Sequence, residues 1–437
     1  MFKQMVAFMD NHHFFNLNHH ACRSFHSTTT SMIQMYTTWL EAVEEGDMAG
    51  VCMIDMSAAF DVVDHKLLLE KLRLYGFDRN AIQWTWSYLT YRSQLVHIEG
   101  SQSSILPLEA GVPQGSILGP LLFTIFTNEL PEVVHDVSCP DRDLLGGTRF
   151  NMHCRECGSL CCYADDSTFY AQGSDPTELS DKLSEKYGKI ADFLTANKLK
   201  VNDEKTHLIV MSTRQKRRYR DTTNITIRTP TAIIQPSEVE RLLGAQVHQD
   251  LHWKEHLLTS DDSLLKSLVK REGALRKISR IASFKTRKMI ANGIYISKLI
   301  YLMPVWMGCE DYLVRALQVS MNKVARIVTK LDIYTPTSVL MKQCGWLTVR
   351  QLMVYHSLML LHKTLKFRTP EYIFQKVTFQ EQQGYNTRQA ADYMTALVSA
   401  GVTERAGVRN CQLEITKNSW CWASVKIYNK LPPDLRA

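Results

Sequence analysis

Two adjacent aspartates between two short apolar runs constrain the fold of this sequence more than any other feature. Asp165 and Asp166 follow the run Leu160–Tyr163 and precede the run Thr168–Ala171. Short apolar runs on both sides of a tight turn are typical of a β-hairpin. Adjacent carboxylates repel each other, so a purely structural turn carries an electrostatic cost here. A bound divalent cation with hard oxygen ligands would remove that cost.

A third acid, Asp55, closes another short apolar run, Val51–Ile54. Strands hold side chains more rigidly than loops do, so strand ends are suitable places for a set of carboxylates. Two metal ions held about 4 Å apart by such a set catalyse phosphoryl transfer. An isolated Asp-Asp pair is more often an ordinary exposed turn, and these residues alone leave that alternative open.

The pattern around these acids predicts an α+β module followed by a helical one. Helical spacing of apolar residues predicts helices at Met32–Val43, His65–Tyr75, Ile82–Leu89, Leu118–Leu130 and Pro176–Ala196. Besides the strands flanking the acids, strands are expected at Gln94–Glu99, Ile105–Glu109, Thr206–Met211 and Asn224–Arg228. From Trp253 to Arg368 the sequence is almost entirely helical in pattern. Residues 1–26 are rich in His and Asn, show no clear period and are expected to be a poorly ordered terminus or a truncated element.

Composition sets further bounds. A chain of 437 residues favours two or three domains. With 45% hydrophobic and 22% charged residues, overall disorder is excluded. The net charge of +7 permits a polyanionic partner without demanding one. Nothing in the sequence specifies an oligomeric state.

The cysteines and the hydropathy pattern bear on localisation. The cysteines number eleven, are scattered, and follow no secretory signal, which favours a reducing, intracellular compartment. No run is long and uncharged enough to predict a membrane span. The basic run Arg214–Arg220 is compatible with a nuclear localisation signal or with phosphate contacts, and a solvated loop is equally compatible.

Three stretches, in this order, resemble motifs A, B and C of reverse transcriptases from non-LTR retrotransposons of the jockey-like LINE group. They are Ile54–Asp61 (IDMSAAFD), Gly111–Ser116 (GVPQGS) and Tyr163–Asp166 (YADD). Asn197–Asn202 with Lys205 is similar to motif D, and Leu243–Asp250 to the primer-grip region. The resemblance runs from about Arg23 to the C-terminus. It implies an α+β right-hand palm with partial fingers, followed by a helical thumb and a C-terminal segment.

The resemblance also divides the chain. Residues 1–26 would be a poorly ordered terminus or a truncated fingers remnant, and 27–250 the fingers/palm core. Residues 251–368 would form the thumb and connection, and 369–437 the C-terminal segment. Before Arg23, Ala21 and Cys22 stand where the family usually has Gly-Phe. The basic finger residues and an endonuclease would lie further upstream, so we expect an N-terminally truncated protein.

Carried over residue by residue, Asp55, Asp165 and Asp166 match the metal-binding catalytic acids, with Mg²⁺ or alternatively Mn²⁺ as cofactor. Asp61 and Asp64 compete with Asp55, and we assign them to structural or helix-capping roles. The resemblance implies an RNA template, a DNA primer and deoxynucleoside triphosphates as partners.

Other residues are implied to contact the nucleotide or the nucleic acid. Phe60 matches a steric gate that excludes a 2′-hydroxyl, which makes DNA the product; plain core packing is the alternative. Gln114 would pack against the templating pair, and Lys205 is a candidate proton donor to pyrophosphate, although a lone surface Lys is usually only solvated. Template and primer contacts are implied for Gly111, Pro113, Gly115, Leu243 and Gly244.

The leading interpretation is therefore an RNA-directed DNA polymerase of a mobile element. A catalytically impaired retrotransposon remnant that only binds nucleic acid is the alternative. An RNA-dependent RNA polymerase would share the palm chemistry, but Phe60 argues against it.

One further cluster has metal-like spacing. Cys154 and Cys157, with His153, Cys161 and Cys162 nearby, are reminiscent of zinc ligands. Cys161 and Cys162 fall in a predicted strand, where side chains alternate between faces, so at most one of them can join a site. We expect free or packed thiols here rather than zinc.

Overall fold

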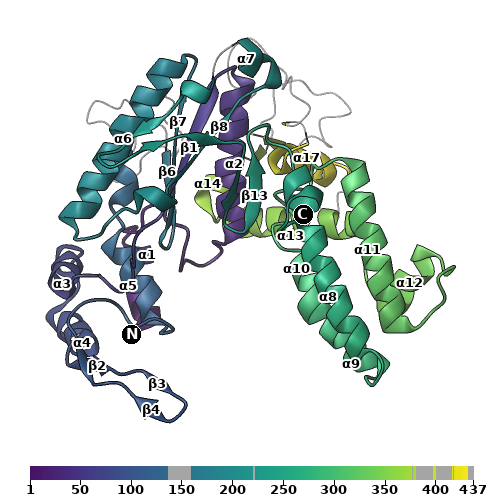
Figure 1. The fold of residues 1–437 in the computed structure, drawn as a ribbon, viewed down its shortest axis with the longest axis horizontal. Helices are drawn as coiled ribbons and strands as arrows, with labels where there is room; N and C mark the ends of the chain where they lie inside the picture. Colours follow the sequence, from purple (N-terminus) through teal and green to yellow (C-terminus); the bar gives the residue numbers. More distant parts are fainter. Residues whose placement is uncertain are drawn as a thin grey trace, which may run out of the picture. The chain divides into compact units, whose positions relative to one another are not determined.

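The computed structural model describes residues 1–135, 159–219, 222–375, 377–379, 397–399, 416 and 418–431. The chain forms two compact units (Figure 1). Unit 1 consists of Met1–Ser27 and Asp47–Ser237, and unit 2 of Thr28–Gly46 and Glu238–Ala437. The α+β fold class is confirmed.

A five-stranded sheet forms the centre of unit 1, in the order β11-β8-β1-β7-β6. Its strands are β1 (Met48–Ile54), β6 (Ser159–Tyr163), β7 (Asp166–Gly173), β8 (His207–Met211) and β11 (Pro236–Ser237). β1 pairs antiparallel with both β7 and β8, and every residue of β1 is buried. A strand covered on both faces has a continuous apolar sequence, which explains why the run at Val51–Ile54 was recognisable.

The described residues of unit 1 also form six helices. They are α1 (Phe2–Asn11), α3 (His65–Leu74), α4 (Arg79–Leu89), α5 (Leu118–Phe126), α6 (Pro176–Ala196) and the short α7 (Arg214–Tyr219). Of these helices, α6 packs on β1 and β7. The 3₁₀ turns η1 (Leu130–Val134), η2 (Asp203–Lys205) and η3 (Thr222–Asn224) connect them to the strands. The basic run predicted as a possible loop is thus helical up to Tyr219.

The long helix α6 begins where the chain supplies a cap. The Asp175 carboxylate accepts hydrogen bonds from the backbone N–H groups of Thr177 and Glu178, and proline stands at the first helical position. The helix packs closely on β1: a Cβ atom added to Gly50 would lie 2.5 Å from Leu183 Cδ1. The absence of a side chain at Gly50 therefore lets α6 approach the strand that ends at Asp55.

The expected hairpin between α4 and α5 is present in two parts. β2 (Arg92–Gln94) pairs with β5 (Leu106–Leu108), and β3 (His97–Ile98) pairs with β4 (Ser101–Gln102). Figure 1 shows this hairpin beyond α4. A smaller ladder joins β9 (Ile227–Arg228) to β10 (Ile233–Ile234).

Of the two alternatives for residues 1–26, a poorly ordered terminus is wrong, and a truncated fingers remnant stays a prediction. Met5 and Met9, one helical turn apart in α1, are buried in the core of unit 1. Further on, the backbone of Asn18 and His20 pairs with Cys162, at 2.9 Å for each hydrogen bond. This segment covers the outer edge of β6, which would otherwise present unpaired backbone groups.

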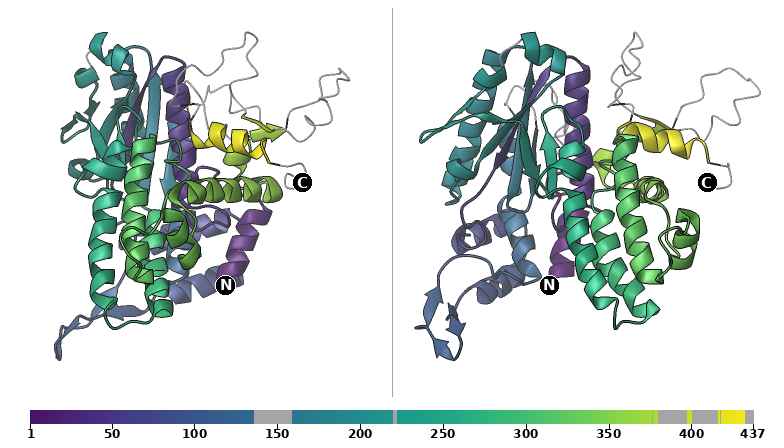
Figure 2. Two further views of the ribbon diagram at one scale, coloured as in Figure 1. Left: turned by 90° about the vertical axis from the view of Figure 1, so that its right-hand side faces the viewer. Right: turned by 45° about the vertical axis from the view of Figure 1, so that its right-hand side comes forward.

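Unit 2 is mainly helical. Its helices are α2 (Thr28–Glu44), α8 (Leu264–Ile278), α9 (Phe284–Ala291), α10 (Ser297–Leu299), α11 (Asp311–Thr329), α12 (Thr337–Cys344), α13 (Val349–Phe367), α14 (Glu371–Phe374) and α17 (Trp420–Tyr428). It also contains the π-helical turns η4 (Glu255–Thr259) and η5 (Asn292–Ile296) and the two-stranded ladders β12 (Val239–Leu242) with β13 (Ala245–His248) and β14 (Val377–Phe379) with β15 (Leu397–Ser399). Helices α8 and α11 lie side by side (Figures 1 and 2).

Helix α2 belongs to unit 2 although it precedes the sheet in the sequence. Thr37 Oγ1 lies 3.5 Å from Cys421 Sγ, and Thr416 Oγ1 donates to Glu44 at 3.0 Å. The limits of the two units therefore differ from the domain boundaries predicted at residues 26, 250 and 368. Those boundaries stay predictions about functional subdomains. Within the described ranges, no helix has the length and apolar character needed to cross a membrane.

Candidate active site

Pairing of β1 with β7 brings the three predicted acids to one end of the sheet. Ile54 pairs with Ser167, so Asp55 follows β1 directly beside Asp166, the first residue of β7. Asp165 lies in the turn between β6 and β7, where Ala164 has a positive φ of 57°. Partial burial raises the pKa of Asp166, and the neighbouring carboxylates of Asp165 and Asp55 raise it further. The Asp166 carboxylate is therefore close enough to both other acids for their charges to affect it.

The backbone after β1 is anchored by the motif D-like segment. The Asn202 N–H donates to the Asp55 carbonyl oxygen at 2.9 Å, and the Ser57 N–H donates to the Lys200 carbonyl oxygen at 2.9 Å. Met56 and Val201 form an antiparallel bridge between these contacts. The segment thus continues the sheet beyond the end of β1 and holds Asp55 in place, a role that its own residues do not reveal.

Asp64 has the helix-capping role expected for it. Its side chain accepts from the Leu67 N–H at 2.9 Å at the start of α3 and from Lys198 Nζ at 2.6 Å. Partial burial acts to raise the pKa of Asp64, but the hydrogen bonds from Lys198 and the backbone outweigh it and hold the pKa below its usual value.

Asp61 connects the motif A-like and motif B-like segments. Gln114 Nε2 donates to Asp61 Oδ1 at 2.8 Å. Two backbone hydrogen bonds of 2.8 Å, from Gly111 N–H to the Val63 carbonyl and from Val112 N–H to the Phe60 carbonyl, join the same segments. Both Asp61 and Gln114 are exposed. This ion-dipole contact gives Gln114 a partner that the sequence did not indicate.

The glycines of the second segment have different surroundings. Gly111 has φ +89°, and a Cβ atom there would lie 2.7 Å from the Asp61 carbonyl oxygen. Gly115 has φ +75° with open space around it. Between them Pro113 accepts through its carbonyl from Ser116 Oγ at 2.7 Å, and Ser116 Oγ in turn accepts from the Gly119 N–H at 2.9 Å at the start of α5. Only Gly111 is required by close packing.

Phe60 and Lys205 occupy contrasting positions. The Phe60 ring is partly buried and packs on the Phe123 ring, with 4.6 Å between the centroids. Lys205 is exposed at the end of η2. In the same turn Asp203 accepts hydrogen bonds from Tyr187, Thr229 and Thr231.

Leu243 and Gly244 form the turn between β12 and β13 in unit 2. Leu242 pairs with Ala245, and the two turn residues have φ values of +45° and +81°. Positive φ at both central positions defines a type I′ hairpin turn. Tyr301 donates its hydroxyl hydrogen to the Leu243 carbonyl oxygen at 2.7 Å, which supports this strained conformation.

The cysteine cluster is only partly in view. His153, Cys154 and Cys157 lie outside the described residues. Cys161 and Cys162 are buried in β6, and burial raises the pKa of Cys162 to about 12 and that of Cys161 as well. These two thiols are packed and protonated at neutral pH.

Residues 2–245, more than half of the chain, match the family Reverse transcriptase (RNA-dependent DNA polymerase), and the chain belongs to that family. The predicted likeness to jockey-type non-LTR elements is confirmed. The match begins within α1, earlier than the expected start near Arg23.

Curated relatives include RNA-directed DNA polymerases of Drosophila elements. The enzyme from the mobile element jockey of Drosophila funebris is 25% identical over 280 residues, covering 63% of this chain and 28% of that protein. The probable enzyme from transposon BS of Drosophila melanogaster is 32% identical over 184 residues, covering 42% of this chain and 19% of that protein. The chain thus matches less than a third of the length of each of these relatives.

Among solved structures, telomerase from Candida albicans in complex with a telomeric RNA fragment aligns with 79% of this chain and 58% of its own, at 13% identity and a TM-score of 0.40. Apo telomerase from Candida tropicalis aligns with 85% of this chain and 58% of its own, at 13% identity and a TM-score of 0.41.

Proposed function

We propose that this chain is the polymerase module of a jockey-like mobile element, an RNA-directed DNA polymerase that extends a DNA primer on an RNA template. The observation that carries the proposal is the meeting of Asp55, Asp165 and Asp166 at the end of β1 and the β6–β7 turn. Membership in the reverse transcriptase family supports it.

The three acids fit a divalent cation, for which we propose Mg²⁺. They offer only hard oxygen ligands, which Mg²⁺ prefers. Within the described part of the chain none of the three forms an ion pair, so their mutual repulsion is not offset by a lysine or arginine. When bound, Mg²⁺ ions would favour the ionised primer 3′-hydroxyl and neutralise charge on the leaving pyrophosphate.

The protein's own residues then have separable roles. Asp55, Asp165 and Asp166 hold the ions, with Asp55 positioned through its backbone by Asn202. The Phe60 ring lies against the sugar of the incoming nucleotide and excludes a 2′-hydroxyl. Lys205 donates a proton to the departing pyrophosphate. Gly111, Pro113, Gly115 and Gln114 lie along the template, and Leu243 with Gly244 along the primer.

The test is template-primed extension by the purified chain. We expect labelled deoxynucleotides to be incorporated on an RNA template with Mg²⁺, and incorporation to stop with a chelator or in Asp165→Asn. A folded wild-type chain that binds the template–primer duplex without extending it would instead support the remnant. Preferential incorporation of ribonucleotides would support an RNA polymerase. Glu99→Asn serves as a control for handling and folding, because Glu99 lies in the β3–β4 turn, distant in the sequence from the three acids.

A further inference from the structure

A second cluster of metal-ligating side chains lies in unit 2, away from the three acids in the sequence. Ligand atoms of His248, His252 and Glu255 all lie within 4.8 Å of one another. We propose that these three residues bind a Zn²⁺ ion that ties the end of β13 to η4. The proposal goes beyond polymerase activity and does not depend on it.

The side chains are close and largely shielded from solvent. The rings of His248 and His252 stack with 4.1 Å between centroids and an interplanar angle of 18°. His252 Nδ1 lies 2.9 Å from Glu255 Oε2. The side chains of His248, His252 and Glu255 are 12%, 20% and 21% exposed. Such shielding lowers the competition from water for a bound cation.

His252 Nδ1 and Glu255 Oε2 are buried atoms without a hydrogen bond among the described residues, although they face each other. A buried polar atom without a hydrogen bond costs free energy. A cation between the imidazole lone pair and the carboxylate would satisfy both atoms. A simple ion pair with a protonated His252 is the competing arrangement, and it predicts no metal binding.

His248 can adjust its proton to a cation. Its Nδ1 accepts a hydrogen bond from the Asp250 N–H at 3.0 Å, and Asp250 Oδ2 lies 3.8 Å from the same nitrogen. A cation bound by Nδ1 replaces the backbone hydrogen bond. A cation bound by Nε2 moves the ring proton to Nδ1, next to the Asp250 carboxylate, which is the common partner of a metal-ligating histidine.

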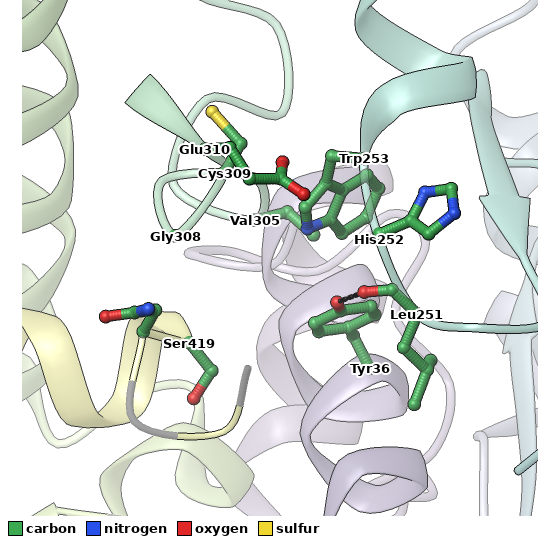
Figure 3. A pocket seen from close by; sticks show the side chains of 10 residues that line it. Tyr36, Leu251, His252, Trp253, Val305, Gly308, Cys309, Glu310 and Ser419 are labelled. Atoms are coloured by element: carbon green, nitrogen blue, oxygen red, sulfur yellow. Dashed lines mark hydrogen bonds between the residues drawn. The ribbon is translucent and has the colours of Figure 1, made fainter. Parts of the chain in front are cut away.

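The loop between the ligands is held in place from its other side. Leu251 and Trp253 flank His252, and the Tyr36 hydroxyl donates to the Leu251 carbonyl oxygen. The Trp253 and Tyr36 rings pack with 4.8 Å between centroids at the edge of a cavity of about 220 Å³. His252 also lines this cavity, and Figure 3 shows its ring beside Trp253, pointing to the side opposite Glu310. Anchoring of the flanking residues therefore fixes His252 in the direction of His248 and Glu255 before any ion binds.

The donor set selects the ion. Two imidazole nitrogens and one carboxylate are the ligands of many zinc sites that keep a fourth position for water. Mg²⁺ prefers oxygen ligands throughout and is disfavoured by the two histidines. A zinc ion here would cross-link the end of the β12–β13 hairpin whose other end is the Leu243–Gly244 turn. The predicted consequence is a stiffer hairpin.

The experiment measures zinc binding by the full chain with Zn²⁺ alone. The background variant carries Cys154→Ser and Cys157→Ser, which remove competing thiols, and Asp165→Asn and Asp166→Asn, which remove the other carboxylate site. After treatment with a chelator and dialysis, calorimetry and elemental analysis give the affinity and the zinc content. We expect one Zn²⁺ per chain in this background.

Adding His252→Ala should abolish this binding or weaken it by at least about 100-fold, and Glu255→Gln should weaken it by at least about tenfold, because each removes a ligand. His362→Ala, which removes an exposed histidine of α13 in the same unit, should leave it unchanged. A Co²⁺-loaded background protein should show a visible spectrum without a thiolate charge-transfer band, an observation independent of how the variants fold. The proposal would be overturned if the background variant bound no zinc. It would also be overturned if adding His252→Ala or Glu255→Gln left the zinc affinity of the background unchanged.

Discussion

Gly111 lies so close to Asp61 that a Cβ atom on Gly111 would stand 2.7 Å from the Asp61 carbonyl oxygen and 2.9 Å from its Cα. The contact joins the segment after β1 to the segment before α5, and the Gln114–Asp61 hydrogen bond lies beside it. The glycine is needed for two reasons, since its φ of +89° is also unfavourable for any side chain.

Gly111→Ala should therefore destabilise unit 1 by about 2–4 kcal/mol, from backbone strain and overpacking together. Gly188→Ala is the matched control, because Gly188 lies inside α6 with nothing within 4 Å of its Cβ position. It should stabilise the protein by about 0.5–1 kcal/mol through helix propensity. Urea unfolding measures both, and an unchanged midpoint for Gly111→Ala would contradict the close contact.

Asp166→Asn should separate stability from activity. Without divalent cations it should raise the thermal midpoint, because it removes a carboxylate whose pKa is raised by burial and by Asp165 and Asp55. Primer extension should fall at least about a hundredfold, since several kcal/mol of metal-dependent stabilisation are lost. Mg²⁺ should raise the midpoint of the wild type and not of the variant. Equal Mg²⁺ responses would exclude Asp166 as a ligand.

Phe60→Ala tests the steric gate against plain core packing. Removal of a partly buried ring that packs on Phe123 should cost about 1–3 kcal/mol in either case. Only a gate also lowers the preference for deoxynucleotides over ribonucleotides, by about tenfold or more in kcat/KM. Phe123→Leu is the control, because Phe123 is fully buried behind Phe60. This substitution should reduce the stability of the protein without changing its preference for deoxynucleotides.

Leu243→Asn should stabilise the β12–β13 hairpin by about 0.5–1 kcal/mol, because Asn tolerates the positive φ of a type I′ turn better than Leu does. If Leu243 contacts the primer, the same change should weaken primer binding. Glu99→Asn repeats the substitution at φ +46° in the β3–β4 turn and should stabilise without affecting primer binding. Unaltered primer affinity in Leu243→Asn would remove this residue from the primer contacts.

His19→Gln should flatten the pH dependence of stability in mildly acidic solution. Burial lowers the pKa of His19 to about 4, although a hydrogen bond from Nε2 to the Thr127 carbonyl at 3.0 Å opposes this. Between pH 6.5, the normal pKa of histidine, and about pH 4, His19 therefore binds a proton in the unfolded chain but not in the folded chain.

This histidine favours folding above pH 6.5, and its contribution declines as the pH falls toward about 4, by roughly 3 kcal/mol in total. Denaturant unfolding at several pH values should show the wild type losing stability faster than His19→Gln in that window. Parallel curves for the two proteins would mean that His19 is protonated in the folded state.

Local patterns predicted most of the elements of unit 1. The alternation of apolar runs and turn residues indicated β1, β6, β7 and β8, and helical spacing indicated α3 and α6, each within a few residues. The motif sequences also indicated which acids to examine. The expected structural or helix-capping role of Asp64 is confirmed, because its side chain caps the start of α3.

Other features depended on residues far apart in the sequence and were missed. The partners of Gln114, Lys198 and Asn202 all come from the segment after β1, and nothing in their own neighbourhoods predicts this. The His- and Asn-rich composition near the N-terminus concealed the helical spacing of Met5 and Met9. His248, His252 and Glu255 are close in the sequence, but they lie in a strand end, a loop and a π-helical turn. No single helical or strand period therefore predicts that their side chains meet.

The sequence by itself determined the strands, the hairpin with its adjacent acids and the family, because hydrophobic period, turn chemistry and short motifs act within a few residues. Only the tertiary structure decided that Asp55 stands beside Asp166, that Asn18 and His20 close the sheet edge, and that α2 packs with the C-terminal half. These pairings are set by which apolar faces and unpaired backbone groups can be buried together, and that depends on the whole chain.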